Sequence, residues 1–262
     1  MEPEYTKSGK TKQCLLSESS EKQFTNILKN LTFERKKIFE AMVFAIKNSD
    51  CALKVVEMIE EFSEDKLGGL YVISDILYNC NKVNIEYSWS YLPLIESRLP
   101  LYLEKLKNSA EALNVINIWE TWGIFDTKYL KGLKSIVDEK PSQNSLLVIK
   151  YKEILNYCDD YFIKNKCKEF GQRTDGHKEQ QILRISYFLN YIIASWGIKD
   201  DWVYVEVQSS GTKPENILEK VDKIIDMLTG TGIQGEELDA LSIQAIKKHL
   251  NKYPEVYICQ HS

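Results

Sequence analysis

A row of three polar side chains runs through an apolar stretch at residues 70–79, LYVISDILYN. Tyr71, Asp75 and Asn79 follow one another at intervals of four residues, so a helix would place them on one side. They offer a phenol ring, a carboxylate and an amide, which are hydrogen-bonding groups of short reach and fixed geometry. A row of this kind predicts binding of a ligand by contact, with no covalent chemistry.

A helical wheel separates the same stretch into two halves. The half expected to enter the core holds Leu70, Val72, Ile73, Ile76, Leu77 and Cys80. The other half holds Tyr71, Ser74, Asp75, Tyr78 and Asn79. A solvated helix face is the alternative interpretation, although such faces more commonly use Lys and Glu.

Two further segments could complete a site. In LTFERKKIFEAM, Arg35, Lys36 and Lys37 follow Thr32, the expected N-cap, so cations and free backbone N–H groups would form an anion site. An indifferent surface cluster is the alternative. In ALNVINIWETW, a row at i, i+4 and i+8 could line a mixed groove for a ring or a proline, or could be ordinary core. That row is Asn114, Ile118 and Trp122.

Helical patterns position all of these residues. Apolar spacing predicts helices almost throughout residues 22–137, with Gly123 ending one of them. Pro93 and Pro100 are expected to break their segment into short helices. Several helices with short connections indicate a helical stack or bundle.

The remaining segments are less regular. Residues 1–20 are expected to form a flexible tail, and residues 138–145 a break. We expect one long helix within 141–170 that packs on the preceding helices, and a loop at 171–177. The region 171–262 is predicted to be mainly helical, with helices at 215–229 and 236–251 and one strand-like stretch, DWVYVEVQ, at 201–208.

Composition excludes several classes of protein. The net charge of −4 argues against a chain that coats nucleic acid by charge alone, although a local basic patch is compatible with it. The six cysteines form no C-x-x-C pair and only three histidines accompany them, so a structural zinc site is not expected. No signal peptide or transmembrane run is recognised, which favours a reducing compartment.

Three segments, LTFERKKI, LYVISDILYN and INIWETWGIF, resemble in order the second, fourth and seventh helices of the RNA polymerase II C-terminal-domain interaction domain, the CID or RPR domain. The nearest variety is that of the snRNP-associated SURP-motif splicing factor. The resemblance covers residues 22–137 and places a CID-like domain at 21–140. It implies an all-α fold, a right-handed superhelix of about eight helices related to ENTH and VHS modules.

The resemblance also implies a groove for phosphorylated heptad repeats of the polymerase tail. The residues that it assigns to peptide contacts are Tyr71, Ser74, Asp75, Asn79, Asn114, Ile118 and Trp122. The residues that it assigns to phosphate are Arg35, Lys36 and Lys37. Family members that read phosphoserine strongly carry arginine at positions 114 and 122, where this sequence has Asn and Trp, so its phosphate reading is expected to be weaker.

The leading hypothesis is a non-enzymatic nuclear adaptor without cofactors, which binds a polymerase-tail peptide in pre-mRNA splicing or RNA processing. A second hypothesis is a scaffold that docks a splicing-complex protein or RNA through residues 140–262. The splicing factor's RNA-recognition motif and SURP module are not recognised here. A third is an ENTH- or VHS-like trafficking adaptor, although residues 1–20 lack the apolar face of an ENTH membrane helix. No catalytic constellation is apparent, and no membrane partner is expected.

Overall fold

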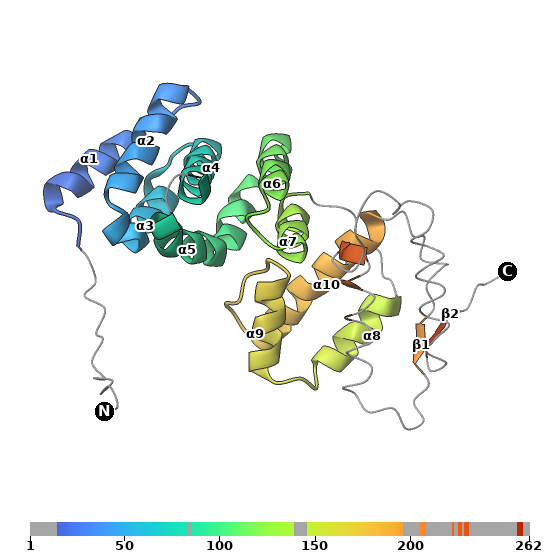
Figure 1. The fold of residues 1–262 in the computed structure, drawn as a ribbon. Coiled ribbons are helices and arrows are strands. Elements are labelled where there is room, and N and C mark those ends of the chain that lie inside the picture. Colours follow the sequence, from blue (N-terminus) through green and yellow to red (C-terminus); the bar gives the residue numbers. More distant parts are fainter. Residues whose placement is uncertain are drawn as a thin grey trace, which may run out of the picture. The chain divides into compact units, whose positions relative to one another are not determined.

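The computed structural model describes most of the chain, and nearly all of that part is α-helical (Figure 1). The described residues are 15–82, 85–138, 146–195, 205–207, 222, 225, 226, 228–230 and 256–258. The expectation of an all-α fold is confirmed for this part of the chain, apart from one short pair of strands.

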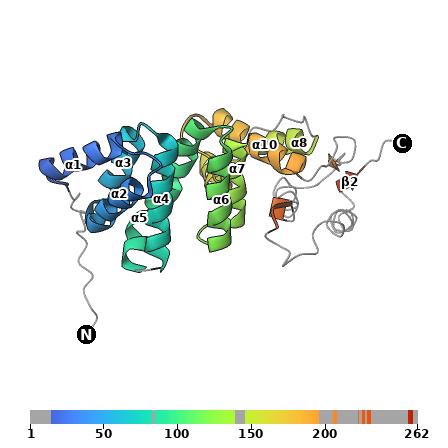
Figure 2. The same cartoon turned by 90° about the horizontal axis from the view of Figure 1, so that it is seen from above.

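The chain divides into two compact units, Met1–Glu96 and Ser97–Ser262, and each is described by itself. The helices of the first unit are α1 (Glu18–Lys29), α2 (Arg35–Lys47), α3 (Ala52–Phe62), α4 (Lys66–Lys82) and the beginning of α5 (Ile85–Leu103), with a 3-10 turn at Ser49–Cys51. α1 packs on α2 and α3, and α2 lies along α4 (Figure 2).

Aromatic side chains and hydrogen bonds hold the first unit together. Phe24 of α1 stacks on Phe44 of α2 with ring centroids 4.3 Å apart. The Tyr91 hydroxyl, from α5, donates to the Ala45 carbonyl at 2.6 Å. The ring stack therefore joins α1 to α2, and the tyrosine hydrogen bond joins α5 to α2.

The first helix starts earlier than the sequence suggests. α1 begins at Glu18, inside the segment predicted as a tail, because the Ser17 side chain accepts a hydrogen bond from the Ser20 backbone N–H. Leu16 is also buried. Residues 1–14 of the predicted tail lie outside the described residues.

The prediction that prolines break residues 91–108 into short helices is wrong for the first part of that segment, since α5 runs through Pro93 and Pro100. Tyr91, Ile95 and Leu99 recur every four residues and are all buried. The apolar face that these side chains form outweighs the hydrogen bonds that the prolines remove. A 3-10 turn at Glu104–Leu106 follows α5.

The second unit holds α6 (Ala110–Trp122), α7 (Thr127–Val137), α8 (Leu146–Leu155), α9 (Asp160–Glu169) and α10 (Lys178–Ser195). α6 pairs with α7, and α10 is contacted by α7, α8 and α9. Its core includes Phe170 and Phe188, whose ring centroids lie 4.7 Å apart. Gly123 ends α6 in the left-handed conformation, as predicted.

Residues 146–170 form two helices, where one long helix was expected. α8 stops at Leu155 and α9 starts at Asp160, because the Asp159 carboxylate accepts from the Phe162 backbone N–H at 2.7 Å and so caps a new helix. α9 contacts α7.

A backbone contact fixes α7 against the end of α9. A Cβ atom added at Gly132 would lie 1.6 Å from the Phe170 carbonyl oxygen, so only glycine allows this approach. The Gln172 side-chain amide donates to the Gly132 carbonyl at 3.2 Å and to the Ser135 hydroxyl at 3.3 Å. Helix α7 is thereby joined to the helices that follow it.

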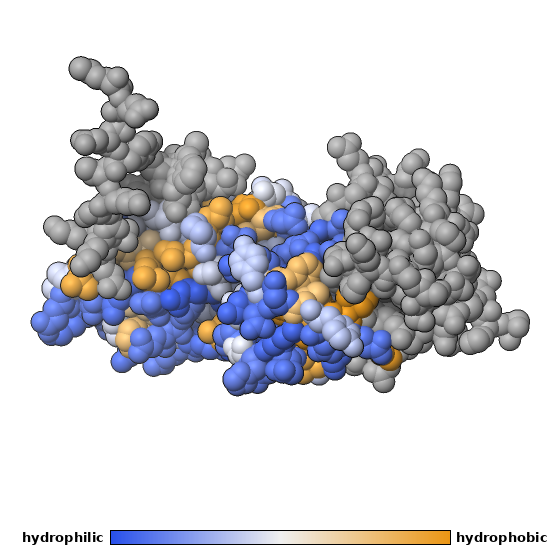
Figure 3. Space-filling view, turned by 90° about the horizontal axis from the view of Figure 1, so that it is seen from below, coloured by the Kyte–Doolittle hydropathy of each residue, from blue (hydrophilic) through white to orange (hydrophobic). Residues whose placement is uncertain are grey.

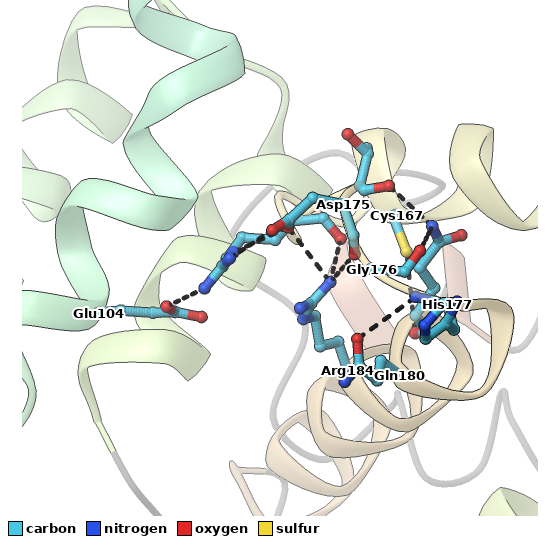
Figure 4. Close-up of polar contacts among 10 residues, drawn as sticks. Glu104, Cys167, Asp175, Gly176, His177, Gln180 and Arg184 are labelled. Atoms are coloured by element: carbon cyan, nitrogen blue, oxygen red, sulfur yellow. Dashed lines mark hydrogen bonds and ion pairs between the residues drawn. The ribbon is translucent and has the colours of Figure 1, made fainter. Parts of the chain in front are cut away.

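The predicted loop at 171–177 is ordered by ion pairs and hydrogen bonds (Figure 4). Arg173 pairs with Glu104 at 2.5 Å and also with Asp175. Arg184 of α10 donates to the Asp175 carbonyl at 2.6 Å. The loop therefore links the turn after α5 to α10 within the second unit.

Two short strands, β1 (Val205–Val207) and β2 (Val256–Ile258), pair antiparallel, and β1 falls within the predicted strand-like stretch. The helix predicted at 236–251 lies outside the described residues, as do residues 139–145. In 215–229, the described positions 222, 225, 226, 228 and 229 are helical. Cys51 is disulfide-bonded.

Candidate functional site

Helix α4 carries the Tyr–Asp–Asn row, and both its capped start and its buried side hold the helix in place. The Asp65 carboxylate accepts from the backbone N–H groups of Leu67 and Gly68 at 3.0 and 3.1 Å and so fixes the start of the helix. The buried side is made of Leu70, Val72, Ile73, Ile76 and Leu77. Tyr71, Asp75 and Asn79 are half-buried. The division into a core side and an accessible side thus agrees with the helical wheel for these residues.

Ser74 departs from that division. It was predicted on the polar face, but it is only 7% exposed. It lies between the two halves of the wheel, and the helices around α4 cover it. Of the four α4 residues assigned to peptide contacts, Ser74 is therefore the least accessible to a ligand.

Phe33 is a member of this surface that the sequence reasoning missed. Its ring meets the Tyr71 ring edge to face, with centroids 6.1 Å apart, and it is 59% exposed. A phenylalanine in the turn before a helix gives no periodic signal. Only the packing of α2 along α4 brings it beside the row, where the two rings form an aromatic pair.

Asp75 lies in an environment that disfavours its charge. Burial raises the pKa of Asp75 above its usual 3.8, and the positive charge of Arg35 lowers it in part. The two predicted groups, the peptide row of α4 and the basic turn of α2, are therefore close enough to interact. The Asn79 amide donates to the Asp75 backbone carbonyl at 2.8 Å, which holds the third member of the row against its own helix.

The basic turn begins later than expected. The N-cap of α2 is Glu34, without a side-chain cap, and the Thr32 hydroxyl accepts only a long 3.4 Å bond from the Glu34 N–H. Arg35, Lys36 and Lys37 are consequently the first three residues of the helix. Arg35 and Lys36 are exposed and Lys37 is half-buried. None of the three forms an ion pair with another described residue.

Helix α6 carries the other predicted row, within the second unit. Asn114 is exposed, Ile118 is 44% exposed and Trp122 is half-buried, whereas Trp119 is fully buried. The Ser109 hydroxyl caps this helix by accepting from the Ala112 N–H at 3.1 Å. The row Asn114, Ile118 and Trp122 therefore forms an accessible side of α6, and Ile118 belongs to it rather than to the core.

The lysines of α7 are held by other groups of the same unit. Lys128 pairs with Glu169 at 2.8 Å and with Asp226 at 2.5 Å. Lys134 pairs with Glu120 at 2.7 Å. Lys131 donates to the Leu228 carbonyl at 3.4 Å. These contacts already partner all three lysines of α7.

Apolar side chains appear at several places on an otherwise hydrophilic surface (Figure 3). Within the described residues, none of the helices combines the length and apolar character needed to cross a membrane. The same part of the chain holds no group of three or more His, Cys, Asp or Glu side chains that could bind a metal ion.

Short helices that pack in sequence and leave polar helix faces open are the architecture of helical protein-interaction domains. Residues 22–133 match the CID domain model, and this segment is therefore a CID domain, as the sequence predicted. The CID is a protein-interaction family rather than a family of enzymes.

Two curated relatives come from Arabidopsis thaliana. Protein RRC1 is 30% identical over 153 residues, which cover 49% of this chain and 16% of RRC1. Protein RRC1-like is 30% identical over 141 residues, which cover 46% of this chain and 15% of the relative. The chain thus spans about a sixth of the length of these relatives. No solved structure gives a significant match.

Proposed function

We propose that this protein is a non-enzymatic nuclear adaptor whose CID domain binds a short peptide, a heptad repeat of the RNA polymerase II C-terminal domain. In this proposal it acts in pre-mRNA splicing or another RNA-processing step. Tyr71, Asp75 and Asn79 contact the peptide, and Phe33 extends their aromatic surface.

The observation that carries the proposal is the state of Asp75. A half-buried carboxylate with a raised pKa, beside Arg35 and on an accessible helix face, is unfavourable for the unliganded protein. Such groups concentrate at functional sites because a ligand can supply the missing hydrogen bonds. A tyrosine hydroxyl or a peptide N–H is a suitable donor to this carboxylate.

The residue types at the predicted positions and the pairing of the cations support weak recognition of phosphate. Asn114 and Trp122 replace the arginines of strong phosphoserine readers, and Lys128 is held in two ion pairs. Arg35 and Lys36 remain as exposed cations. We therefore propose that serine phosphorylation strengthens binding by less than about tenfold, because an exposed ion pair contributes up to about 1 kcal/mol.

Calorimetric titration with a two-repeat heptad peptide tests the proposal, using unphosphorylated and serine-phosphorylated forms. Wild-type protein is expected to bind the unphosphorylated peptide with measurable heat, and Asp75→Ala to abolish that binding. Glu61→Ala, at an exposed acid of α3, serves as the control and should bind normally. No binding at millimolar peptide, or equal binding by Asp75→Ala, would remove the site assignment.

A further inference from the structure

The two most exposed aromatic side chains in the described part of the chain lie in the connection between α8 and α9 and in the first turn of α9. Tyr157 is 87% exposed and Tyr161 is 77% exposed, compared with 59% for Phe33. Large aromatic rings are usually at least partly covered, because burial of their apolar surface stabilises the fold. Two uncovered rings four residues apart therefore indicate a surface that a partner covers.

The backbone beneath these rings is held in place. Lys178 of α10 donates to the carbonyls of Asn156 and Cys158 at 2.8 and 2.5 Å, which closes the end of α8. Asp159 caps α9. Tyr157 consequently lies on an ordered turn and Tyr161 on the capped first turn of α9, so little backbone entropy is lost when a ligand binds them.

The outer face of α9 adds positive charge to the rings. At about 100° per residue, Tyr161 and Lys168 fall in line, with Lys164 and Asn165 on either side of that line. Lys164, Asn165 and Lys168 are exposed, and neither lysine forms an ion pair among the described residues. Lys166, on the opposite side of the helix, is instead paired with Glu169 and Asp222 at 3.0 and 2.8 Å.

Acidic side chains occupy little of this face. Asp159 is engaged as the cap of α9, and Glu169 points to the lysines of the inner side. Asp160 is exposed at the edge of the face, nearest to Lys164. The line from Tyr161 to Lys168 therefore combines an aromatic ring with unpaired positive charge.

We infer that the α8–α9 turn and the outer face of α9 bind single-stranded RNA, with Tyr157 and Tyr161 stacking on bases and Lys164 and Lys168 contacting phosphates. Exposed rings beside cations are the combination that single-stranded nucleic acids require, because every base offers a flat face and every linkage a negative charge. An acidic peptide would use the lysines and leave the rings without a role. A duplex would hide its base faces from them. This surface shares no residue with the peptide site proposed on α2 and α4.

Fluorescence anisotropy with the full 262-residue chain and a labelled oligouridine of about 12 nucleotides tests the inference at low salt. The double variant Tyr157→Ala/Tyr161→Ala is expected to weaken binding by about tenfold or more. The matched control is Tyr187→Ala, which removes a 57%-exposed ring from α10 and should bind as the wild type does. Asp75→Ala should also leave RNA binding unchanged, which separates this surface from the peptide site.

The salt dependence gives a second readout. Replacing Lys164 and Lys168 by alanine should reduce the slope of log K against log salt by about 1.4, since each phosphate contact with a single strand contributes about 0.7. Circular dichroism should show intact helices in each variant, because all four substituted side chains are exposed. The inference is overturned by three outcomes: no saturable binding, unchanged affinity of the tyrosine variant, or displacement of RNA by duplex or by polyglutamate at equal concentration.

Discussion

Helices α2 and α4 of the first unit differ from helices α7 and α9 of the second in whether their charged side chains form ion pairs. On α2 and α4, Arg35 and Lys36 have no ion-pair partner among the described residues, and Asp75 has a raised pKa. On α7 and α9, Lys128 and Lys166 each join two carboxylates.

The pKa of Glu169 shows the consequence of that pairing. Burial would raise it, but hydrogen bonds and charge from Lys128 and Lys166 lower it below 4.5. Burial also disfavours the charge of Lys128, yet its hydrogen bonds to Asp226 and Glu169 raise the pKa of this lysine. Removal of one member of a partly buried pair leaves the other charge uncompensated, whereas a charge that already lacks a partner marks a surface suited to a ligand.

The largest expected effect concerns the close approach of α7 to the end of α9. Gly132→Ala should destabilise the protein by about 3–5 kcal/mol, because the new Cβ would lie 1.6 Å from the Phe170 carbonyl oxygen. Urea denaturation followed by circular dichroism measures this loss. The control is Gly123→Ala, which meets nothing within 4 Å and should cost only about 1 kcal/mol, for its positive φ. Equal losses would show that the helix contact contributes nothing.

The ion pairs of the second unit should contribute next. Lys128→Met leaves Glu169 and Asp226 with one fewer cation, and it should lower the free energy of unfolding by about 1–3 kcal/mol. Arg35→Met should change that free energy by less than about 0.5 kcal/mol, because Arg35 is exposed. The same urea experiment compares the two variants. If Arg35→Met proved as harmful as Lys128→Met, the contrast between the two regions would be wrong.

The pH dependence of stability should follow Glu169. Since the folded protein lowers the pKa of Glu169 below 4.5, its contribution is present above pH 4.5 and is lost as pH falls through the lowered value. Glu169→Gln should therefore reduce stability at neutral pH by about 1 kcal/mol and flatten the acid side of the profile. Thermal melting between pH 3 and 7 measures both. A profile parallel to that of the wild type would contradict the lysine contacts.

The smallest effect has the opposite sign. Because the pKa of Asp75 is raised, its ionised form is disfavoured in the folded state, and stability falls as pH rises through the carboxyl range. Asp75→Asn should therefore stabilise the protein at neutral pH by about 0.5 kcal/mol while it weakens heptad-peptide binding. Melting temperature and calorimetry on the same sample test both halves. A destabilised Asp75→Asn variant would argue for a structural role of this carboxylate.

Much of the fold could be predicted from local patterns. The apolar and polar sides of α4 follow from periodicity, with the exception of Ser74, which lies between them. Gly123 predicts the end of α6 because few other residues readily adopt the left-handed conformation found there. The helix break predicted at Pro93 was wrong because the tendency of proline to break a helix is local. Burial of the apolar face of α5 outweighs that tendency.

For the candidate site, too, part could be predicted from local sequence patterns and part depends on the tertiary structure. By itself, the sequence determined which side chains share a helix face: Tyr71 with Asp75, and Asn114 with Ile118. Only the tertiary structure decided that Phe33 meets Tyr71, that Arg35 acts on Asp75, and that Lys128 is already paired. The physical reason is that spacing along a helix fixes directions around its own axis, whereas burial and charge pairing depend on which helices lie beside it.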